Sequence, residues 1–358
     1  MNKTLGLFLL VASALAAQDK LIGGPYVVNT TPTSATVMWV MQRGTVTAGT
    51  QPGAADKTEP VLHAEHINLT SLRPDTAYYY DVLGGREEGK GSFRTPPTAQ
   101  TSATFDFLVY GDNRTRHDVH KRVVAAIAKA VPSPAFVVQT GDMVENGADT
   151  ALWPVFFDIE RNLLKNTSFF PSLGNHERDD RNFFDFFNVA SAGYYSFNWG
   201  KCHFAVIDSD IGNVSSNAAG RQAFWEMQTR WLEEDLKASQ NADFRFVVAH
   251  HPPMTAVRSR QGANPQMIEL TPLLEKYHVT AGLFGHDHNY QHYLKNGVHY
   301  FVDGGGGAPL YDVDLPPAGI TQKVKSIEGF MVFHVAGKSI KVDAIDINGE
   351  VIDATELK

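Results

Sequence analysis

Cysteine is almost absent from this chain of 358 residues, in which Cys202 is the only one. An intrachain disulfide is therefore excluded, and the fold must be stabilised by packed cores. Cys202 lies in the apolar run 202–207, which predicts a buried strand and an inert thiol. The sequence also lacks a Gly-x-Ser-x-Gly element, so nothing in it supports a covalent serine or cysteine mechanism.

A basic excess is missing as well. The chain has 31 Lys and Arg against 39 Asp and Glu, which gives a net charge of −8 at pH 7. Surfaces for nucleic acid or anionic membranes usually carry a positive balance. We therefore expect no nucleic-acid surface, and extended anionic polymers are weak substrate candidates.

Long hydrophobic runs are limited to the start of the chain. An apolar run at residues 5–10 lies between Lys3 and the small-x-small sequence 14–16, which predicts a secretory signal peptide over residues 1–17. The run is shorter than the ~20 residues of a transmembrane helix, and no later run is long enough. We expect a soluble mature protein that is secreted or periplasmic. The alternatives are a disordered tail and a retained anchor helix.

Residues 18–98 differ in pattern from the rest of the chain. Short alternating runs, such as 34–40, are separated by turn residues, which is typical of all-β structure. The tryptophan-bearing run 34–40 and the stretches 72–80 and 91–97 resemble a fibronectin type III sandwich. The Pro-Pro pair that follows predicts a short, stiff connection, because consecutive prolines favour extended backbone.

From about residue 105, apolar strands alternate with helical patterns, as in an α/β sheet. Apolar residues have helical spacing over 119–130 and 222–236, and residues 329–345 predict closing β-hairpins. The sequence therefore predicts an all-β sandwich followed by an α/β domain over residues 99–358.

Candidate metal ligands lie in five short polar blocks of this second part. Four of the blocks follow apolar runs, at 107–110, 136–138, 246–248 and 280–284, which predict buried strands. Because open α/β sheets place their sites at the carboxyl ends of the strands, we expect the ligands to cluster there. The six candidates are Asp112, Asp142, Asn175, His250, His286 and His288.

The candidates combine carboxylate, amide oxygen and imidazole, which suit Fe, Zn or Mn. Two cations about 3.5–4 Å apart repel, so one ligand should be a bridging carboxylate, and Asp142 after a glycine is the best candidate. His286 and His288 point to the same side of an extended segment and can address two metals. Taken alone, Asp112 also fits a helix N-cap and His250 a loop histidine, but the ordered set favours a two-metal hydrolytic site.

The ligand blocks, together with residues 285–290 (Gly-His-Asp-His-Asn-Tyr) and the glycine run 302–308, carry a family resemblance. Residues from about 105 to 345 resemble the calcineurin-like metallophosphoesterase superfamily, and the order of the domains resembles its purple acid phosphatase branch. The resemblance implies an αββα fold and two metal ions. It implies a first metal held by Asp112, Asp142 and His288, and a second held by Asp142, Asn175, His250 and His286.

Two positions depart from the pattern of the family. Arg114 stands where much of the superfamily has histidine, and Glu145 stands where purple acid phosphatases have a tyrosine ligand. The first metal therefore has three assigned ligands, and Glu145, His117, His120 or water would complete it. Arg114 would hold a phosphate through its planar fork or form a surface salt bridge. Without tyrosinate, no purple colour is expected.

These features predict a secreted dinuclear metallophosphoesterase, of the hydrolase class, that acts on small phosphate monoesters. A water held between two metals loses a proton near neutral pH, which supplies the nucleophile. His176, Arg114 and His251 are the expected catalytic side chains, and the resemblance implies that His176 contacts the phosphate and acts as general acid. The first alternative is phosphodiester hydrolysis, which the loops 210–217 and 258–266 would decide. The second is a binding or adhesion protein with an inactive phosphatase-like domain.

Overall fold

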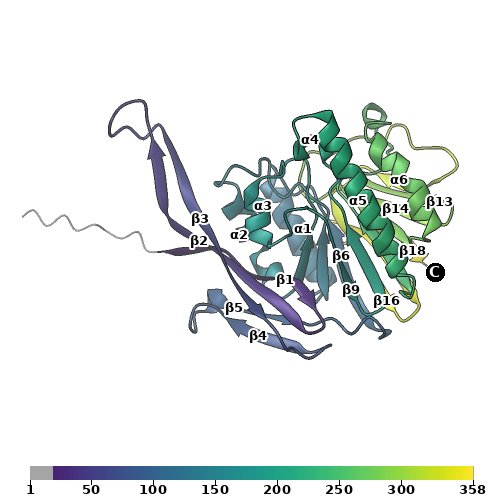
Figure 1. Ribbon diagram of the computed structural model, residues 1–358, viewed down its shortest axis with the longest axis horizontal. Coiled ribbons are helices and arrows are strands. Elements are labelled where there is room, and N and C mark those ends of the chain that lie inside the picture. Colours follow the sequence, from purple (N-terminus) through teal and green to yellow (C-terminus); the bar gives the residue numbers. More distant parts are fainter. Residues whose placement is uncertain (1–18, 358) are drawn as a thin grey trace, which may run out of the picture.

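The computed structural model describes residues 19–357. Two β-sheets pack face to face, and helices cover their outer faces (Figure 1). The α/β architecture expected for the second part of the chain is therefore confirmed. The predicted signal peptide lies outside the described residues. Within residues 19–357, no helix is long and apolar enough to cross a membrane.

Nine strands form the first sheet. In spatial order they are β18 (Val351–Leu357), β17 (Ser339–Asp346), β16 (Gly329–Ala336), β6 (Thr104–Tyr110), β7 (Phe136–Gln139), β8 (Ser168–Pro171), β1 (Lys20–Thr31), β2 (Ser34–Ala48) and β3 (Lys57–Leu69). The helices on its outer face are α1 (His117–Ala130), α2 (Trp153–Leu164) and α3 (Arg181–Phe187).

Seven strands form the second sheet. In spatial order they are β15 (Thr321–Lys325), β13 (Tyr290–Lys295), β14 (Val298–Asp303), β12 (Ala281–Phe284), β11 (Phe244–Val248), β10 (Cys202–Val206) and β9 (Tyr195–Trp199). The helices on its outer face are α5 (Ala218–Ala238) and α6 (Pro265–Lys276). The remaining elements are the hairpin β4 (Ala77–Asp81) and β5 (Lys90–Arg94) and the short helices η1 (Glu87–Gly89), α4 (Ile211–Val214) and η2 (Arg258–Arg260).

Phenylalanine fills the space between the two sheets. Phe107 on β6 stacks on Phe136 of β7 with ring centroids 4.9 Å apart, and on Phe333 of β16 at 4.6 Å. From the second sheet, Phe204 and Phe246 stack on each other at 4.7 Å and meet Phe107 edge-on. Stacked and edge-to-face pairs of this kind add to the stabilisation from burial.

The apolar runs predicted as buried strands are confirmed as β6, β7, β11 and β12. Strands β6 and β7 are parallel neighbours in the first sheet, and β11 and β12 are parallel neighbours in the second. Cys202 is buried in β10, and burial raises the pKa of its thiol to about 12. The predicted burial of Cys202 is therefore confirmed, and the raised pKa favours the protonated thiol, which is the unreactive form.

The N-terminal strands extend the first sheet. Strand β1 lies parallel to β8, with Val27 opposite Ser168, and the hydroxyls of Thr30 and Ser168 are hydrogen-bonded at 2.8 Å. The β4–β5 hairpin packs on these strands through Phe93, and β2 and β3 run on as a long arm (Figure 1). The predicted all-β character is confirmed. The fibronectin type III identity of the strands and the domain boundary after residue 98 stay predictions.

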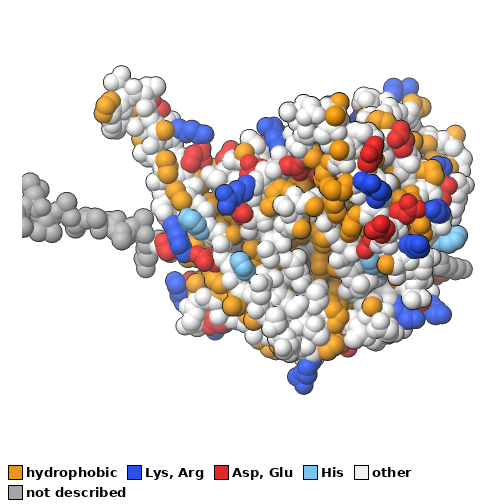
Figure 2. Space-filling view, viewed as in Figure 1, with side chains coloured by type: hydrophobic (Ala, Val, Ile, Leu, Met, Phe, Trp, Pro, Cys, Tyr) orange, Lys and Arg blue, Asp and Glu red, His pale blue; other side chains and the backbone are white. Residues whose placement is uncertain are grey.

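Charged side chains of both signs are mixed on the face shown in Figure 2. Among the surface ion pairs, Lys276 of α6 lies 2.6 Å from Glu233 of α5. This mixture accords with the net negative charge of the chain. The absence of a nucleic-acid surface stays a prediction.

A buried carboxylate joins helices α1 and α2 to strand β6. Glu160 on α2 is fully buried and accepts a hydrogen bond from the hydroxyl of Tyr110, which lies 2.9 Å from both carboxylate oxygens. His120 on α1 places its Nε2 2.6 Å from the same carboxylate. His120 is thus held in the core by Glu160, which supports a structural role for it over a role as a ligand of the first metal.

Candidate metal centre

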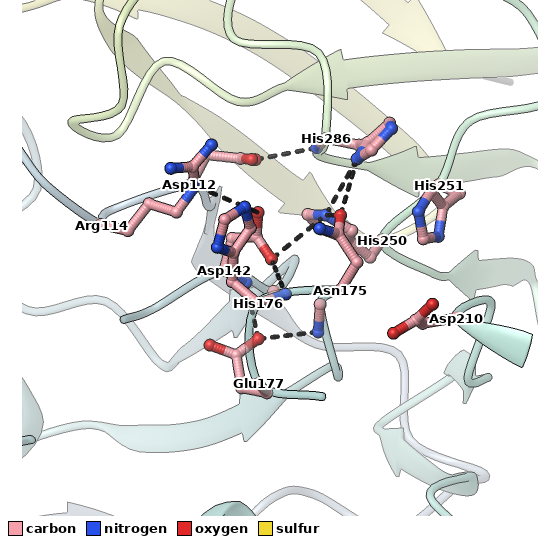
Figure 3. Close-up of polar contacts among 12 residues, drawn as sticks. Asp112, Arg114, Asp142, Asn175, His176, Glu177, Asp210, His250, His251 and His286 are labelled. Carbon is pink, nitrogen blue, oxygen red and sulfur yellow. Dashed lines mark hydrogen bonds and ion pairs between the residues drawn. The ribbon is translucent and has the colours of Figure 1, made fainter. Parts of the chain in front are cut away.

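Loops at the carboxyl ends of five strands carry the six predicted ligands. The structure brings all six together at one edge of the two sheets, and Figure 3, which labels five of the six, shows those five side chains converging there. The strands and the ligands that follow them are β6 with Asp112, β7 with Asp142, β8 with Asn175, β11 with His250, and β12 with His286 and His288.

The first ligand group contains Asp112, Asp142 and His288. Their ligand atoms all lie within 4.8 Å of one another, and His288 Nε2 is 3.4 Å from Asp112 Oδ1. The other nitrogen of His288, Nδ1, donates to the carbonyl of Pro309 at 2.6 Å. This hydrogen bond fixes the orientation of the ring and leaves Nε2 facing the group.

The second ligand group contains His250, His251 and His286, whose ligand atoms also lie within 4.8 Å of one another. Asn175 adds its side-chain oxygen, which is 3.1 Å from His250 Nε2 and 3.0 Å from His286 Nδ1. Asp142 Oδ1 lies 3.4 Å from His250 Nε2. Asp142 therefore reaches both groups, as a bridging carboxylate must.

Three of the ligands have a left-handed backbone. The φ angle is 57° at Asp112, 57° at Asp142 and 69° at His286. Such conformations cost about 1–3 kcal/mol each and concentrate at functional sites. Gly141 makes the turn before Asp142 possible, because it has a φ of 97° and a Cβ there would lie 2.7 Å from His250 Nδ1.

One buried oxygen of the centre has no hydrogen-bond partner among the described residues. Asp112 is fully buried, and its Oδ2 accepts the backbone N–H of His286 at 2.9 Å, whereas Oδ1 is unpaired. A buried carboxylate oxygen without a partner is costly, and a cation between Asp112 and His288 would satisfy it. The donors are carboxylate, amide and imidazole, so the residues fit Fe, Zn or Mn.

Charges within the centre shift the pKa values of its side chains. Burial acts to lower the pKa of His250, but the Asp142 carboxylate prevails and raises it to about 10. Burial acts to raise the pKa of Asp142, but His250 prevails and holds it well below its usual range. For His251, burial and the neighbouring His250 lower the pKa to about 3. The His251 ring is therefore neutral near pH 7, whereas His250 holds a proton that a metal ion would have to displace, because only the neutral imidazole binds a metal.

Arg114 reaches into the first ligand group. Its Nε lies 3.4 Å from Asp142 Oδ2, and its Nη2 lies 3.5 Å from His288 Nε2. Its Nη1 forms an ion pair with the Glu145 carboxylate. Glu145 is therefore linked to the first ligand group by way of the Arg114 side chain. His117 is the first residue of α1. A role for Glu145 or His117 as a further ligand of the first metal stays a prediction.

The other predicted catalytic side chains, His176 and His251, flank the centre. His176 Nδ1 donates to a backbone carbonyl at 2.7 Å, and Nε2 lies 3.9 Å from Asp142 Oδ2. The backbone N–H of His176 also donates to Asp142 Oδ1 at 3.0 Å. The ring of His251 is held by a serine hydroxyl at 3.0 Å and lies 4.2 Å from the ring of His286. The position of His251 therefore suits a metal ligand as well as a catalytic group, and its catalytic role stays a prediction.

Glu177 is a residue whose role sequence reasoning missed. Its buried carboxylate accepts the backbone N–H groups of Asp142, Met143 and Gly174, each at 2.8 Å. It thereby ties the loop after β7 to the loop after β8. Burial, followed by the Asp142 charge, raises the pKa of Glu177 to about 7. Its one signal in the sequence is its place directly after His176 in Gly-Asn-His-Glu.

A tyrosine and an arginine that sequence reasoning also missed support His288. The ring of Tyr311 stacks on His288 with centroids 4.3 Å apart. Arg260 lies over the Tyr311 ring at 4.4 Å, donates to its hydroxyl at 3.0 Å, and donates to the carbonyl of His286 at 3.0 Å. These contacts hold the orientation of both histidine ligands.

Glutamine at position 177 should damage the centre although it preserves the shape of the side chain. Both oxygens of Glu177 face backbone N–H donors, so one of these donors would oppose the new amide NH2. We expect Glu177→Gln to lower the free energy of unfolding by about 1–3 kcal/mol and metal affinity by about 10- to 100-fold. Urea unfolding and metal titration measure the two effects, with the exposed change Glu234→Gln as control. A variant as stable and as metal-binding as the unchanged chain would contradict this role.

A double β-sheet with carboxylates, an amide and imidazoles converging at its carboxyl edge is the arrangement of a metallophosphoesterase. The family model for calcineurin-like phosphoesterases matches residues 105–290, more than half of the chain. The chain belongs to the calcineurin-like phosphoesterase family.

The chain is also similar in sequence to individual proteins of this kind. It is 26% identical over 302 residues to the probable purple acid phosphatase 20 of Arabidopsis thaliana, with 74% of this chain and 67% of the relative covered. It is 30% identical over 139 residues to human tartrate-resistant acid phosphatase type 5, with 36% and 42% covered. An uncharacterized protein of Mycobacterium tuberculosis, Rv2577, is 24% identical over 309 residues, with 75% of this chain covered. The chain spans 57% of the length of that relative.

Solved structures have the same fold. The purple acid phosphatase PPD1 from yellow lupin superposes with a TM-score of 0.74 at 17% identity, over 93% of this chain and 73% of the lupin chain. The structure of PhoD superposes with a TM-score of 0.65 at 11% identity, over 94% and 88%. The predicted calcineurin-like superfamily is confirmed, and the likeness to proteins named purple acid phosphatase agrees with the predicted branch.

Proposed function

We propose that this protein is a metal-dependent phosphatase that hydrolyses small phosphate monoesters at a centre with two metal positions. The observation that carries the proposal is the place of Asp142, whose carboxylate belongs to the first ligand group and also lies 3.4 Å from His250 in the second. A single anion shared by two groups of ligands is what a dinuclear hydrolytic centre requires. Membership of the calcineurin-like phosphoesterase family supports the same reaction class.

The residues divide into two positions. Fe, Zn or Mn ions in such a centre would polarise the phosphate and make water a stronger nucleophile. The first position would use Asp112, Asp142 and His288. The second would use Asp142, Asn175, His250 and His286, with His251 as a further imidazole within reach.

We propose that His176 acts on the leaving group. A backbone carbonyl holds its Nδ1, so Nε2 is the nitrogen that faces the centre. A side chain that is one-fifth exposed can meet substrate and solvent in turn, and imidazole is suited to donate a proton to a leaving oxygen near neutral pH. We assign His176 as the general acid and Arg114 as a positive group beside the phosphate.

We further propose that the protein is exported from the cell. Secretion, or export to a periplasm, rests on the signal-peptide pattern of residues 1–17. Sequencing the N-terminus of the protein recovered from the culture medium or periplasm of its host tests it. A mature chain that begins after residue 17 would support export, and a chain recovered only inside the cell with its first residues intact would contradict it.

Turnover of two chromogenic esters tests the reaction. The metal-loaded full chain is assayed with p-nitrophenyl phosphate and with bis-p-nitrophenyl phosphate, after separate loading with Fe, Zn and Mn. We expect the monoester to be hydrolysed at least about tenfold faster in kcat/KM, a difference of about 1.4 kcal/mol in transition-state binding. Faster turnover of the diester would make the protein a phosphodiesterase. No turnover of either ester with any of the metals would favour a binding protein.

A further inference from the structure

Arg114 contacts two of the three side chains of the first ligand group, and this has a consequence for metal loading. Resting on the function proposed above, we propose that the two metal positions fill in sequence, the second position first, because the Arg114 guanidinium competes with a cation at the first. The centre would then hold one ion tightly and a second ion weakly. Loss of the Arg114 charge should make the two affinities more alike.

The contacts of Arg114 carry this proposal. Its nitrogen atoms lie 3.4 Å from Asp142 Oδ2 and 3.5 Å from His288 Nε2, which are two of the three side chains of the first ligand group. Its side chain is 12% exposed, so the charge is held within the centre rather than in solvent. The guanidinium carries its positive charge at every accessible pH.

A cation at the first position and the Arg114 charge repel each other across a few ångströms. Repulsion between charges at this distance is strong when the pair is largely shielded from water. The second position does not meet the same obstacle. Its ligands Asn175, His250 and His286 face each other on the far side of the shared Asp142, whereas the polar contacts of Arg114 within the centre are with the first group.

Glu145 gives Arg114 a second place to bind. Its side chain is 47% exposed and already forms an ion pair with Nη1 of Arg114. When a cation enters the first group, the guanidinium can keep this partner while it moves away from Asp142 and His288. Arg114 and Glu145, the two positions that depart from the pattern of the family, would then act as a pair.

Metal titration of the full chain tests the proposal without reference to activity. The metal-free protein is titrated with Zn²⁺ by calorimetry, and the number of ions bound is checked by elemental analysis after equilibrium dialysis. We expect two binding steps whose affinities differ by at least about tenfold. Asp112→Asn should remove the weaker step alone, because Asp112 is a proposed ligand of the first position only and asparagine keeps an oxygen that can accept the backbone N–H of His286.

Neutral variants of Arg114 supply the decisive comparison. Arg114→Met, which keeps much of the side-chain length, should tighten the weaker step by at least about tenfold and leave the tighter step unchanged. Arg114→Gln is a second neutral variant in case the first does not fold, and thermal unfolding establishes the fold of each. Arg114→Lys keeps the positive charge and should keep the difference in affinity between the two binding steps. The control is Arg181→Met, at an arginine that is 88% exposed.

Each result has a definite meaning. Two steps of equal affinity in the unchanged chain would overturn the proposal, and so would a gap that persists in both neutral variants of Arg114. In either case two ions bind, so the proposed function would stand. A chain that binds no Zn²⁺ in either step would instead overturn the proposed function together with this inference.

Discussion

Replacing Asp142 by asparagine should lower the turnover of p-nitrophenyl phosphate by at least about a thousandfold. Asp142 belongs to the first ligand group and its carboxylate also lies 3.4 Å from His250 in the second, so the change removes a negative charge beside both metal positions. Asparagine can still accept the backbone N–H of His176 through its side-chain oxygen, which limits the damage to the fold. Steady-state kinetics, with metal content measured on the same samples, records the effect.

The matched control for this change is Asp118→Asn, which removes the same charge from an exposed position in the first turn of α1. It should leave turnover and metal content unchanged. An Asp142→Asn variant with turnover within tenfold of the unchanged chain, and with the same metal content, would contradict the role of Asp142 as a shared ligand.

Removal of the Glu160 carboxylate should lower the free energy of unfolding more than the Glu177→Gln change does. Glu160→Ala leaves the buried ring of His120 and the buried hydroxyl of Tyr110 without their partner. A buried polar group left without its hydrogen-bond partner costs about 1–3 kcal/mol, so the loss of both contacts should cost roughly 2–6 kcal/mol. Urea unfolding followed by circular dichroism measures the loss.

A control for Glu160 lies on the exposed face of α5. Glu234→Ala removes a glutamate from a helix without emptying a buried site, and it should change the free energy of unfolding by less than about 0.5 kcal/mol. A loss of less than 1 kcal/mol for Glu160→Ala, on the order of an ordinary surface substitution, would show that the buried cluster contributes little.

The strands beside the centre could be predicted because they are buried on both faces. A strand that packs against a second sheet on one side and helices on the other reads as a continuous apolar run, as in 107–110 and 246–248. A polar residue directly after such a run lies at the end of a strand. The positions of Asp112 and His250 therefore followed from the order of residues alone.

The arrangement of the N-terminal strands could not be read in the same way. Alternation shows that a segment is a strand, but it does not show which strand is its neighbour. The parallel pairing of β1 with β8 joins Val27 to Ser168, which is far along the chain. Pairing at that distance depends on the packing of the whole fold.

The residues that support the ligands were missed for a related reason. Glu177 acts on the N–H group of Asp142, 35 residues away, and Arg260 acts through Tyr311, 51 residues away. No short motif joins such residues, and their side chains are ordinary in type. The orientation of Arg114 toward Asp142 and His288 is likewise a property of the folded loops, although its departure from the family pattern was visible in the sequence.

Dependence of turnover on bound metal tests the central claim most directly. Hydrolysis of p-nitrophenyl phosphate is measured on the same preparation before chelation, after removal of all metal as verified by elemental analysis, and after reloading with Fe, Zn or Mn. The account predicts that turnover falls to background when metal is removed and returns as ions are bound again. Turnover that persists in the metal-free protein would contradict it.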